Sequence, residues 1–282
     1  MAGSITRALI TLLAIGLLVS GCAGNLNNKK WSDPNVARSP IESVLASLPP
    51  LDGPKITIAV YDFQDKTGQR KPNDKFSVLS SAVTQGAEVW VIDALKKVSG
   101  GTWFQVVERV ALDNLVKERQ LIRSTREVYE GKDAPQLKPM LFAGIIVTGG
   151  VVGYDSNIAS GGKGARYLGI GASTQYRIDQ VTVSMRVISV QTGEVLLTVA
   201  TEKRIASHRN SADVFRFLDL GTNALEVEAG SAINEPVNYA VRAAIESSVV
   251  EIVKQGEKQG LWKYKKLASE KNEEKSINEN ND

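Results

Sequence analysis

Residues 168–187 read LGIGASTQYRIDQVTVSMRV, and this stretch decides the fold. From Leu168 to Ile178, an apolar or mildly polar residue alternates with a glycine or a polar residue. Successive side chains of a strand point to opposite faces, so the pattern predicts a strand with one apolar face and one small or polar face. After Asp179 the apolar residues occupy the other phase, beginning with Val181. A slip of one residue exchanges the two faces, which indicates a strand that leaves one environment and enters another.

The residues around this strand predict a first β-hairpin over residues 154–180. The Ser-Gly-Gly-Lys-Gly segment at residues 160–164 is expected to be a flexible turn between arms at residues 154–160 and 165–180. Residues 181–196, in the other phase, are expected to form strands of the soluble, periplasmic part of the chain.

A second hairpin is expected over residues 197–220. Its arms are predicted at residues 197–205 and 214–218, with a turn near residues 207–211. His208, the only histidine, then falls in a turn, where solvent exposure is expected.

Two interpretations of these hairpins stay open from the pattern alone. They are either long, half-solvated hairpins on a soluble domain or transmembrane hairpins. Alternation of outward apolar and inward polar residues over about 10 residues is typical of transmembrane strands. Two hairpins cannot close a barrel by themselves, and open sheet edges in lipid are costly. The transmembrane interpretation therefore requires an oligomer that shares one barrel.

The N-terminus has the form of a bacterial lipoprotein signal. An apolar run from Ala8 to Val19 is shorter than the about 20 residues of a membrane-spanning helix and suits a signal peptide over residues 1–21. It ends in Val19-Ser20-Gly21-Cys22, the pattern of a lipobox, which predicts lipid on Cys22. An ordinary signal peptide with a chance cysteine is the alternative. Cys22 is the only cysteine, so no internal disulfide forms, and acylation removes the oddity of a lone exported thiol.

Residue 23 is alanine rather than the aspartate that retains lipoproteins at the inner membrane. Attachment to the inner leaflet of an outer membrane is therefore expected. Residues 22–54 hold five of the nine prolines and predict an extended linker between the lipid and the body.

The body is expected to be a mixed α+β structure that begins with an α/β domain at residues 55–153. The expected elements are strands at residues 56–61, 103–107 and 145–152, and helices at residues 78–98 and 109–123. Residues 221–264 are expected to be a C-terminal helical part, with Asn234 as a helix cap and Pro236 in the first turn. The charged, asparagine-rich tail at residues 265–282 predicts disorder.

Several ordered segments resemble the CsgG family of curli secretion channels. The first is residues 60–72, VYDFQDKTGQRKP; the others are residues 153–157, 161–172, 191–194, 234–237 and 260–262. The resemblance runs from the lipobox to about Trp262. It implies an outer-membrane lipoprotein whose chains assemble into a ring, each giving two hairpins to one barrel, with the α/β domains forming a periplasmic vestibule. The largest barrels known have about 36 strands, so four strands per chain imply roughly nine chains.

The resemblance also implies the cargo and partners. Unfolded curli subunits would diffuse through the pore, a CsgE-like adaptor would cap the vestibule, and a CsgF-like protein would sit at the pore. In this family the loop after the first strand makes the pore constriction, with a tyrosine and an Asn-Phe pair after Lys-Pro. Here Phe76 matches the phenylalanine, Lys75 stands where the asparagine would be, and Asn73 follows the proline. The loop is two residues shorter and has no tyrosine. A buried Phe76 that anchors the helix start is the alternative.

Composition narrows the remaining classes. The formal net charge is +3 with basic residues spread along the chain and few aromatics, which does not favour nucleic acid. Neither glycine-rich segment completes G-x-G-x-x-G, and Gly162-Lys163 lacks the Ser or Thr of a phosphate-binding loop. With one histidine and an acylated cysteine, no catalytic pair, metal site or cofactor is expected. The leading hypothesis is a non-enzymatic secretion pore; the alternative is a periplasmic lipoprotein that acts as a binding or scaffold module.

Overall fold

The computed structural model describes residues 34, 36–69, 83–131, 133–167, 170–217, 224–234 and 236–265. The chain divides into two units, Met1–Arg38 and Ser39–Asp282, and every helix and strand described below belongs to the second. The signal peptide, Cys22, the three predicted constriction residues at 73, 75 and 76, and the tail from residue 266 lie outside the described residues.

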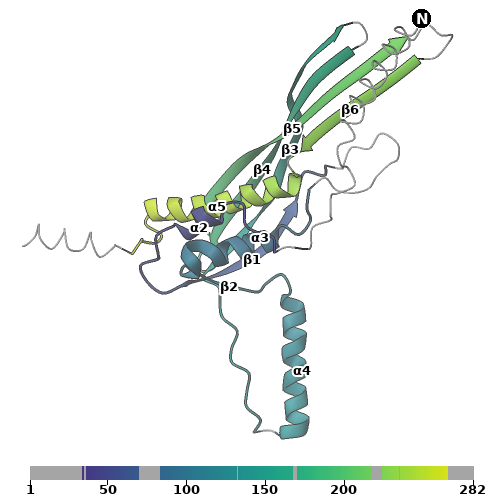
Figure 1. The fold of residues 1–282 in the computed structure, drawn as a ribbon. Helices are drawn as coiled ribbons and strands as arrows, with labels where there is room; N and C mark the ends of the chain where they lie inside the picture. The colour runs from purple at the N-terminus through teal and green to yellow at the C-terminus, as the bar shows by residue number, and fades with distance from the viewer. Residues whose placement is uncertain are drawn as a thin grey trace, which may run out of the picture. The chain divides into compact units, whose positions relative to one another are not determined.

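The described part of the second unit is a mixed α+β structure built on one sheet (Figure 1). The strands are β1 (Ile56–Asp65), β2 (Phe104–Val107), β3 (Ile145–Tyr167), β4 (Ile170–Ser189), β5 (Val195–Phe217) and β6 (Ala224–Asn234). The helices are α2 (Glu42–Ala46), α3 (Glu88–Lys97), α4 (Leu112–Glu130) and α5 (Val237–Lys258), with a 3₁₀ turn, η2 (Val98–Gly101).

The sheet order is β2-β1-β3-β4-β5-β6. β1 pairs in parallel with β2 and β3, and the other neighbours pair antiparallel. α5 packs on β4 and β5, with α3 and α2 beside it, and covers one face of the lower sheet (Figure 1). The core between them includes Phe63, Trp103, Met185 and Ile245, all 0% exposed. Each fully buried side chain of this size contributes roughly 1.5–3 kcal/mol.

The first hairpin has its turn in a different place from the one predicted. β3 runs without a break through residues 160–164, and Tyr167 pairs with Ile170, so the connection lies at residues 168–169. The three glycines of the predicted turn have no positive φ. They serve as small strand residues: a Cβ on Gly161 would fall 2.7 Å from the Tyr176 ring, which occupies that space.

The second hairpin is also longer than predicted. Residues 207–211 are not a turn, because β5 continues to Phe217 and pairs there with β6. The prediction that residues 221–264 are helical is wrong for residues 224–234, which form β6. Asn234 pairs with Ser207 in this ladder, so the cap of α5 falls to Pro236 instead. His208 lies within β5, although its side chain is exposed, as expected for a turn residue.

The two predicted helices of the α/β part are shifted. α3 begins at Glu88, and residues 83–87 are not helical, although Val83 and Ala87 are buried. α4 extends seven residues beyond the predicted end at 123, to Glu130. No side chain of α4 is buried, so the mixed apolar stripe that predicted the helix does not pack into the core.

The linker prediction is wrong for its second half. Residues 42–46 form α2, and Leu45, Leu48 and Leu51 are 0%, 7% and 8% exposed. Leucines at intervals of three residues supply an apolar side that packs against the body, which the proline content concealed. A hydrogen bond also joins this segment to the body: Trp103 Nε1 donates to the carbonyl oxygen of Pro49 at 2.7 Å.

Candidate functional site

The candidate site is the outer part of strands β3 to β6, beyond Asp179, which we call the hairpin region. It comprises residues 156–167, 170–178, 206–217 and 224–234. Figure 1 shows these strands continuing past α5. The Ile170–Ile178 segment extends about 30 Å at roughly 3.3 Å per residue, the thickness of the hydrocarbon core of a bilayer.

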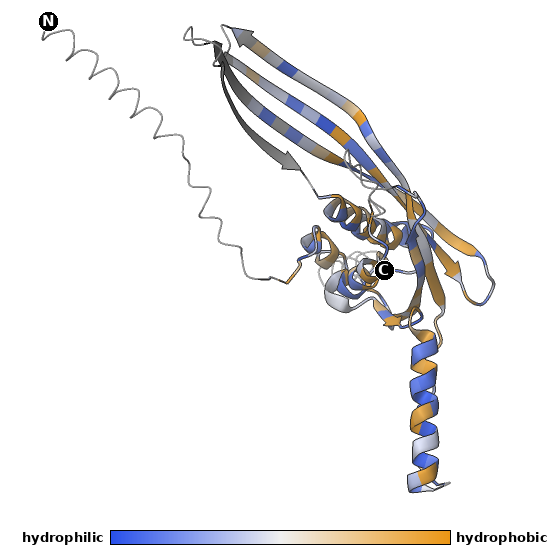
Figure 2. Ribbon diagram, turned by 90° about the vertical axis from the view of Figure 1, so that its right-hand side faces the viewer, coloured by the Kyte–Doolittle hydropathy of each residue, from blue (hydrophilic) through white to orange (hydrophobic). Residues whose placement is uncertain are grey.

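One face of the sheet changes character at Asp179. Below it, Val181, Val183 and Met185 are 0% exposed under α5. On the same face above it come Arg177, Gln175 and Ser173, none of them buried. The burial of these residues shows that the packed core ends on this face at Asp179, the residue after which the sequence pattern changes phase. In Figure 2 the strands are mostly orange near α5 and mixed in colour farther out.

The polar face of the hairpin region is made of small or polar residues from neighbouring strands. Ser173 of β4 pairs with Ser211 of β5, and their hydroxyl oxygens lie 2.6 Å apart in a hydrogen bond. On β3, Gly164 and Gly162 pair with Ser173 and Gln175. Small side chains at neighbouring positions leave room on this face that bulky ones would fill.

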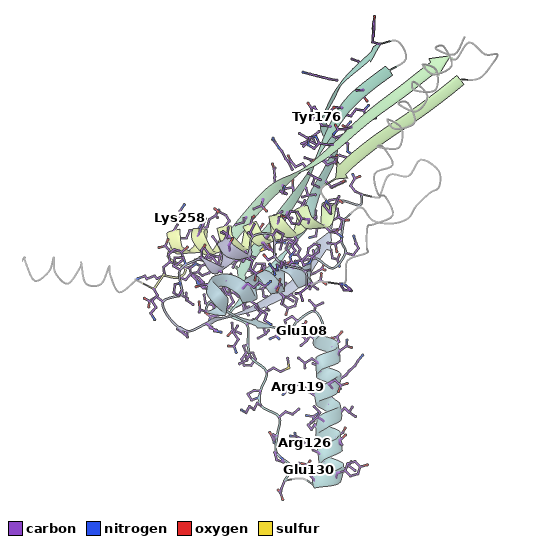
Figure 3. The ribbon with its side chains drawn as sticks, in the orientation of Figure 1. Glu108, Arg119, Arg126, Glu130, Tyr176 and Lys258 are labelled. Carbon is purple, nitrogen blue, oxygen red and sulfur yellow. The ribbon has the colours of Figure 1, made fainter. Side chains whose placement is uncertain are left out.

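The opposite face is more apolar but not uniformly so. Its members include Ala159, Ala165, Tyr167, Ala172, Tyr176, Ile178 and Ala206. Figure 3 places Tyr176 midway along the hairpin strands. One row across the sheet is polar, because Lys163, Thr174 and Asn210 are register partners. His208, the register partner of Tyr176, is polar as well.

Two strands of the hairpin region have one side with no partner among the described residues. β1 pairs with β3 only as far as Val151, so β3 from Val152 to Tyr167 is paired only with β4. β6 ends the sheet order and is paired only with β5. Unpaired backbone donors and acceptors on such edges are a template for pairing with another chain.

Asp65 connects the two described segments that flank residues 70–82, the stretch that includes the three predicted constriction residues. One carboxylate oxygen accepts hydrogen bonds from the backbone N–H of Thr67 at 2.9 Å and from its hydroxyl at 2.6 Å. The other accepts one from Gln85 Nε2 at 3.2 Å. Thr67 and Gln85, on either side of that stretch, thus donate hydrogen bonds to one side chain. Sequence reasoning did not single out Asp65, although Asp-x-Thr-Gly is a common turn signature.

No group of three His, Cys, Asp or Glu side chains that could hold a metal occurs among the described residues. In the same part of the chain, no helix combines the length and apolar character needed to cross a membrane.

Comparison with known proteins places the chain in a family. The family model described as curli production assembly/transport component CsgG matches residues 43–281. The curli production assembly/transport component CsgG of Salmonella typhimurium is 41% identical over 268 residues, which cover 94% of each chain. The protein of the same name from Escherichia coli strain K12 is 40% identical over 265 residues, covering 93% of each chain.

Among solved structures, a PelC dodecamer from Paraburkholderia phytofirmans matches with a TM-score of 0.26 and 11% identity, over 73% of this chain and 91% of that one. A likeness this distant carries no argument about fold or assembly. The family match and the identity to the two curli components are decisive, because both extend over most of the chain. The chain belongs to the CsgG family of curli production assembly/transport components.

Proposed function

We propose that this protein is the subunit of an oligomeric outer-membrane channel through which unfolded curli-type amyloid subunits leave the cell by diffusion. The observation that carries the proposal is the exchange of faces at Asp179. A sheet that is apolar toward α5 becomes polar on that same face in the hairpin region, over about the length of a transmembrane strand. Family membership supports the transport role.

In the proposed assembly the open edges of β3 and β6 explain why one chain is not enough. An unpaired backbone edge in lipid costs several kcal/mol for each unsatisfied group. Pairing the β3 edge of one copy with the β6 edge of the next removes that cost for every copy only when the ring closes. With four strands per chain and a barrel of about 36 strands, the ring contains roughly nine copies.

The parts outside the described residues have proposed roles in this assembly. Lipid on Cys22 anchors each chain to the inner leaflet, and the body lies in the periplasm. The proposed role of Phe76, with Lys75 and Asn73, is to contribute one ring of side chains that narrows the pore. CsgE-like and CsgF-like proteins are the proposed accessory partners.

A second candidate is a periplasmic lipoprotein that acts as a binding or scaffold module, with both hairpins in water. The polar row of Lys163, Thr174 and Asn210 on the more apolar face favours it, because those side chains would otherwise face lipid. A pocket of about 500 Å³ between α2, β5 and α5 is where such a module could hold a ligand.

Two matched tryptophan substitutions distinguish these candidates. Ser173 lies on the polar face and Ala172 beside it on the opposite face. Lipidated protein is reconstituted into planar bilayers, and its oligomeric size is measured in parallel. The pore proposal predicts that Ser173→Trp lowers the conductance whereas Ala172→Trp leaves it unchanged. A wild-type protein that stays monomeric and gives no conductance overturns the pore and favours the module.

A further inference from the structure

β3 contains a bulge opposite Asp179. Asp155 pairs with Gln180 and Ala159 with Ile178, so three residues of β3 lie opposite one residue of β4. The central one, Asn157, has φ +59°. Positive φ is uncommon outside glycine, but asparagine tolerates it better than most residues. The backbone therefore departs from regular pairing at one definite place.

The side chain of Asp179 makes three hydrogen bonds here, one with the side chain of Tyr154 and two with Asn157 and Arg177. Its Oδ1 accepts a hydrogen bond of 2.8 Å from the backbone N–H of Asn157, and its Oδ2 accepts one of 3.1 Å from Arg177 Nη2. The carboxylate is almost fully enclosed, since Asp179 is 2% exposed. A carboxylate leaves water only when its oxygens are paired and hydrogen-bonded, and the contacts with Tyr154, Asn157 and Arg177 meet this need.

The position of Asp179 coincides with the exchange of faces. Its register partner on β5 is Ile205, 1% exposed, and the next residue below it on the same face is Val181, 0% exposed. The next residue above it on that face is Arg177, whose side chain is 50% exposed. Asp179 is thus where the packed core ends and the polar face of the hairpin region begins.

We propose that Asp179 is a positioning residue with two duties at this boundary. Its Oδ1 fixes the bulge and thereby the register of the outer part of β3. Its Oδ2 holds the Arg177 guanidinium against the sheet and neutralises it. The second duty rests on the proposed pore, in which Arg177 faces the lumen. The first duty is independent of the proposed pore.

The register of β3 depends on the bulge, because the direction of the side chains in a strand repeats every two residues. With the bulge in place, Ser160 pairs with Arg177 and Gly162 with Gln175 on the polar face. Absorbing one bulge residue into the ladder would shift the outer part of β3 by one position and turn every side chain to the other face. The β3 edge that faces a neighbouring copy would shift with it.

The first duty is tested by a cross-link that reports register. Cysteines replace Ala159 and Ile178, which are register partners directly beyond the bulge. Disulfide yield is measured in the full lipidated chain, alone and with Asp179→Ala or Asp179→Asn. Asp179→Ala removes the acceptor for Asn157 and should lower the yield about tenfold. Asp179→Asn keeps an acceptor oxygen and should retain most of the yield.

The matched control is Asp155→Asn, which removes an exposed carboxylate on the opposite face, where Asp155 pairs with Gln180. It should leave the cross-link unchanged. An undiminished yield with Asp179→Ala overturns the first duty, whether or not the protein forms a pore. A loss as large with Asp155→Asn also overturns it, because the effect would then not be specific to Asp179.

The second duty is tested by ion selectivity in planar bilayers under a salt gradient. Asp179→Asn leaves the Arg177 charge uncompensated, so the reversal potential should shift toward anion permeability. Adding Arg177→Gln to Asp179→Asn should return the potential to the wild-type value. A conducting Asp179→Asn variant with wild-type selectivity overturns the second duty, whereas a wild-type protein without conductance overturns the pore itself.

Discussion

The hydroxyl of Ser39 donates a hydrogen bond of 2.7 Å to Glu246 Oε2, joining positions 207 residues apart in a buried environment. The same oxygen accepts a bond of 3.3 Å from the backbone N–H of Ile41. The other carboxylate oxygen accepts one of 2.8 Å from Arg242 Nε. Glu246, 0% exposed, therefore fastens the chain at the start of the body to the middle of α5. In the proposed pore this contact fixes where the lipid tether ends and the rigid body begins.

Replacing Glu246 by glutamine should destabilise the body. The variant keeps the shape of the side chain but loses the negative charge of the carboxylate to which Ser39 and Arg242 donate. We expect the free energy of unfolding to fall by about 1–3 kcal/mol. Thermal unfolding followed by circular dichroism measures the effect. Glu42→Gln, an exposed carboxylate on α2, is the control and should unfold like wild type. Equal stability of the two variants would contradict the assigned role of Glu246.

Gly256→Ala should destabilise α5 although alanine is the better helix former by about 1 kcal/mol. A Cβ at this position would fall 2.1 Å from the Trp262 ring. The Nε1 of that ring donates a hydrogen bond of 2.8 Å to the carbonyl oxygen of Val253. The ring also packs edge-to-face against Trp103, with the two ring centroids 5.8 Å apart. Overpacking of this kind costs roughly 1–3 kcal/mol.

The same thermal measurement, made on a double-mutant cycle with Trp262→Ala, tests this cause for Gly256. If the clash with the ring is responsible, Gly256→Ala should cost much less once the ring is gone. Additive losses in the cycle would contradict the clash.

Arg126→Ala should loosen the segment that returns from α4 to β3. Arg126 Nη1 donates a bond of 2.6 Å to the carbonyl oxygen of Pro135, and Arg119 Nη2 donates one of 2.7 Å to that of Lys138 (Figure 3). Losing one such bond should raise chymotryptic cleavage at Phe142, which is 88% exposed, by about two- to tenfold. Arg123→Ala, an exposed neighbour on α4, should leave the cleavage rate unchanged. If Arg126→Ala is cleaved at the same rate as Arg123→Ala and the wild type, the hydrogen bond from Arg126 to Pro135 does not hold this segment.

Phe76→Ala should change transport without unfolding the chain. In the proposed pore, removing a ring of aromatic side chains widens the constriction, so we expect a higher conductance and an unchanged circular dichroism spectrum. Lys75→Ala in the same loop separates the effect of width from that of charge, because it should mainly alter ion selectivity. Loss of folding in Phe76→Ala would instead support a buried Phe76 that anchors the start of a helix.

In the proposed pore, Cys22→Ser should leave the body of the chain folded and impair membrane insertion. Several acyl chains on one residue give stable anchoring, whereas the variant has none. We expect inserted oligomer to fall about tenfold or more in membrane fractions, while thermal unfolding of the body is unchanged. Full pore activity in this variant would show that the anchor is dispensable.

Local patterns in the sequence were informative where the physical cause is itself local. Strand β2, predicted at residues 103–107, is found at Phe104–Val107, because an apolar run bounded by turn residues needs no distant information. Helix α4 was predicted from its periodicity, but its length was not, since the charged residues at its end fit helix and loop equally well. The docking of Leu45 was missed because the prolines around it dominated the local pattern.

By itself, the sequence determined the two-faced character of the strands, the exchange of faces at Asp179 and the resemblance to one family. These follow from residue order, because side chains of a strand alternate whatever surrounds them. Only the tertiary structure decided where the hairpins turn, which residues form the bulge, and that Asp179 reaches Asn157 while Glu246 reaches Ser39. Small residues such as those at 160–164 suit a strand as well as a turn. The choice between them depends on the neighbouring strand, here on the Tyr176 ring that fills the space beside Gly161.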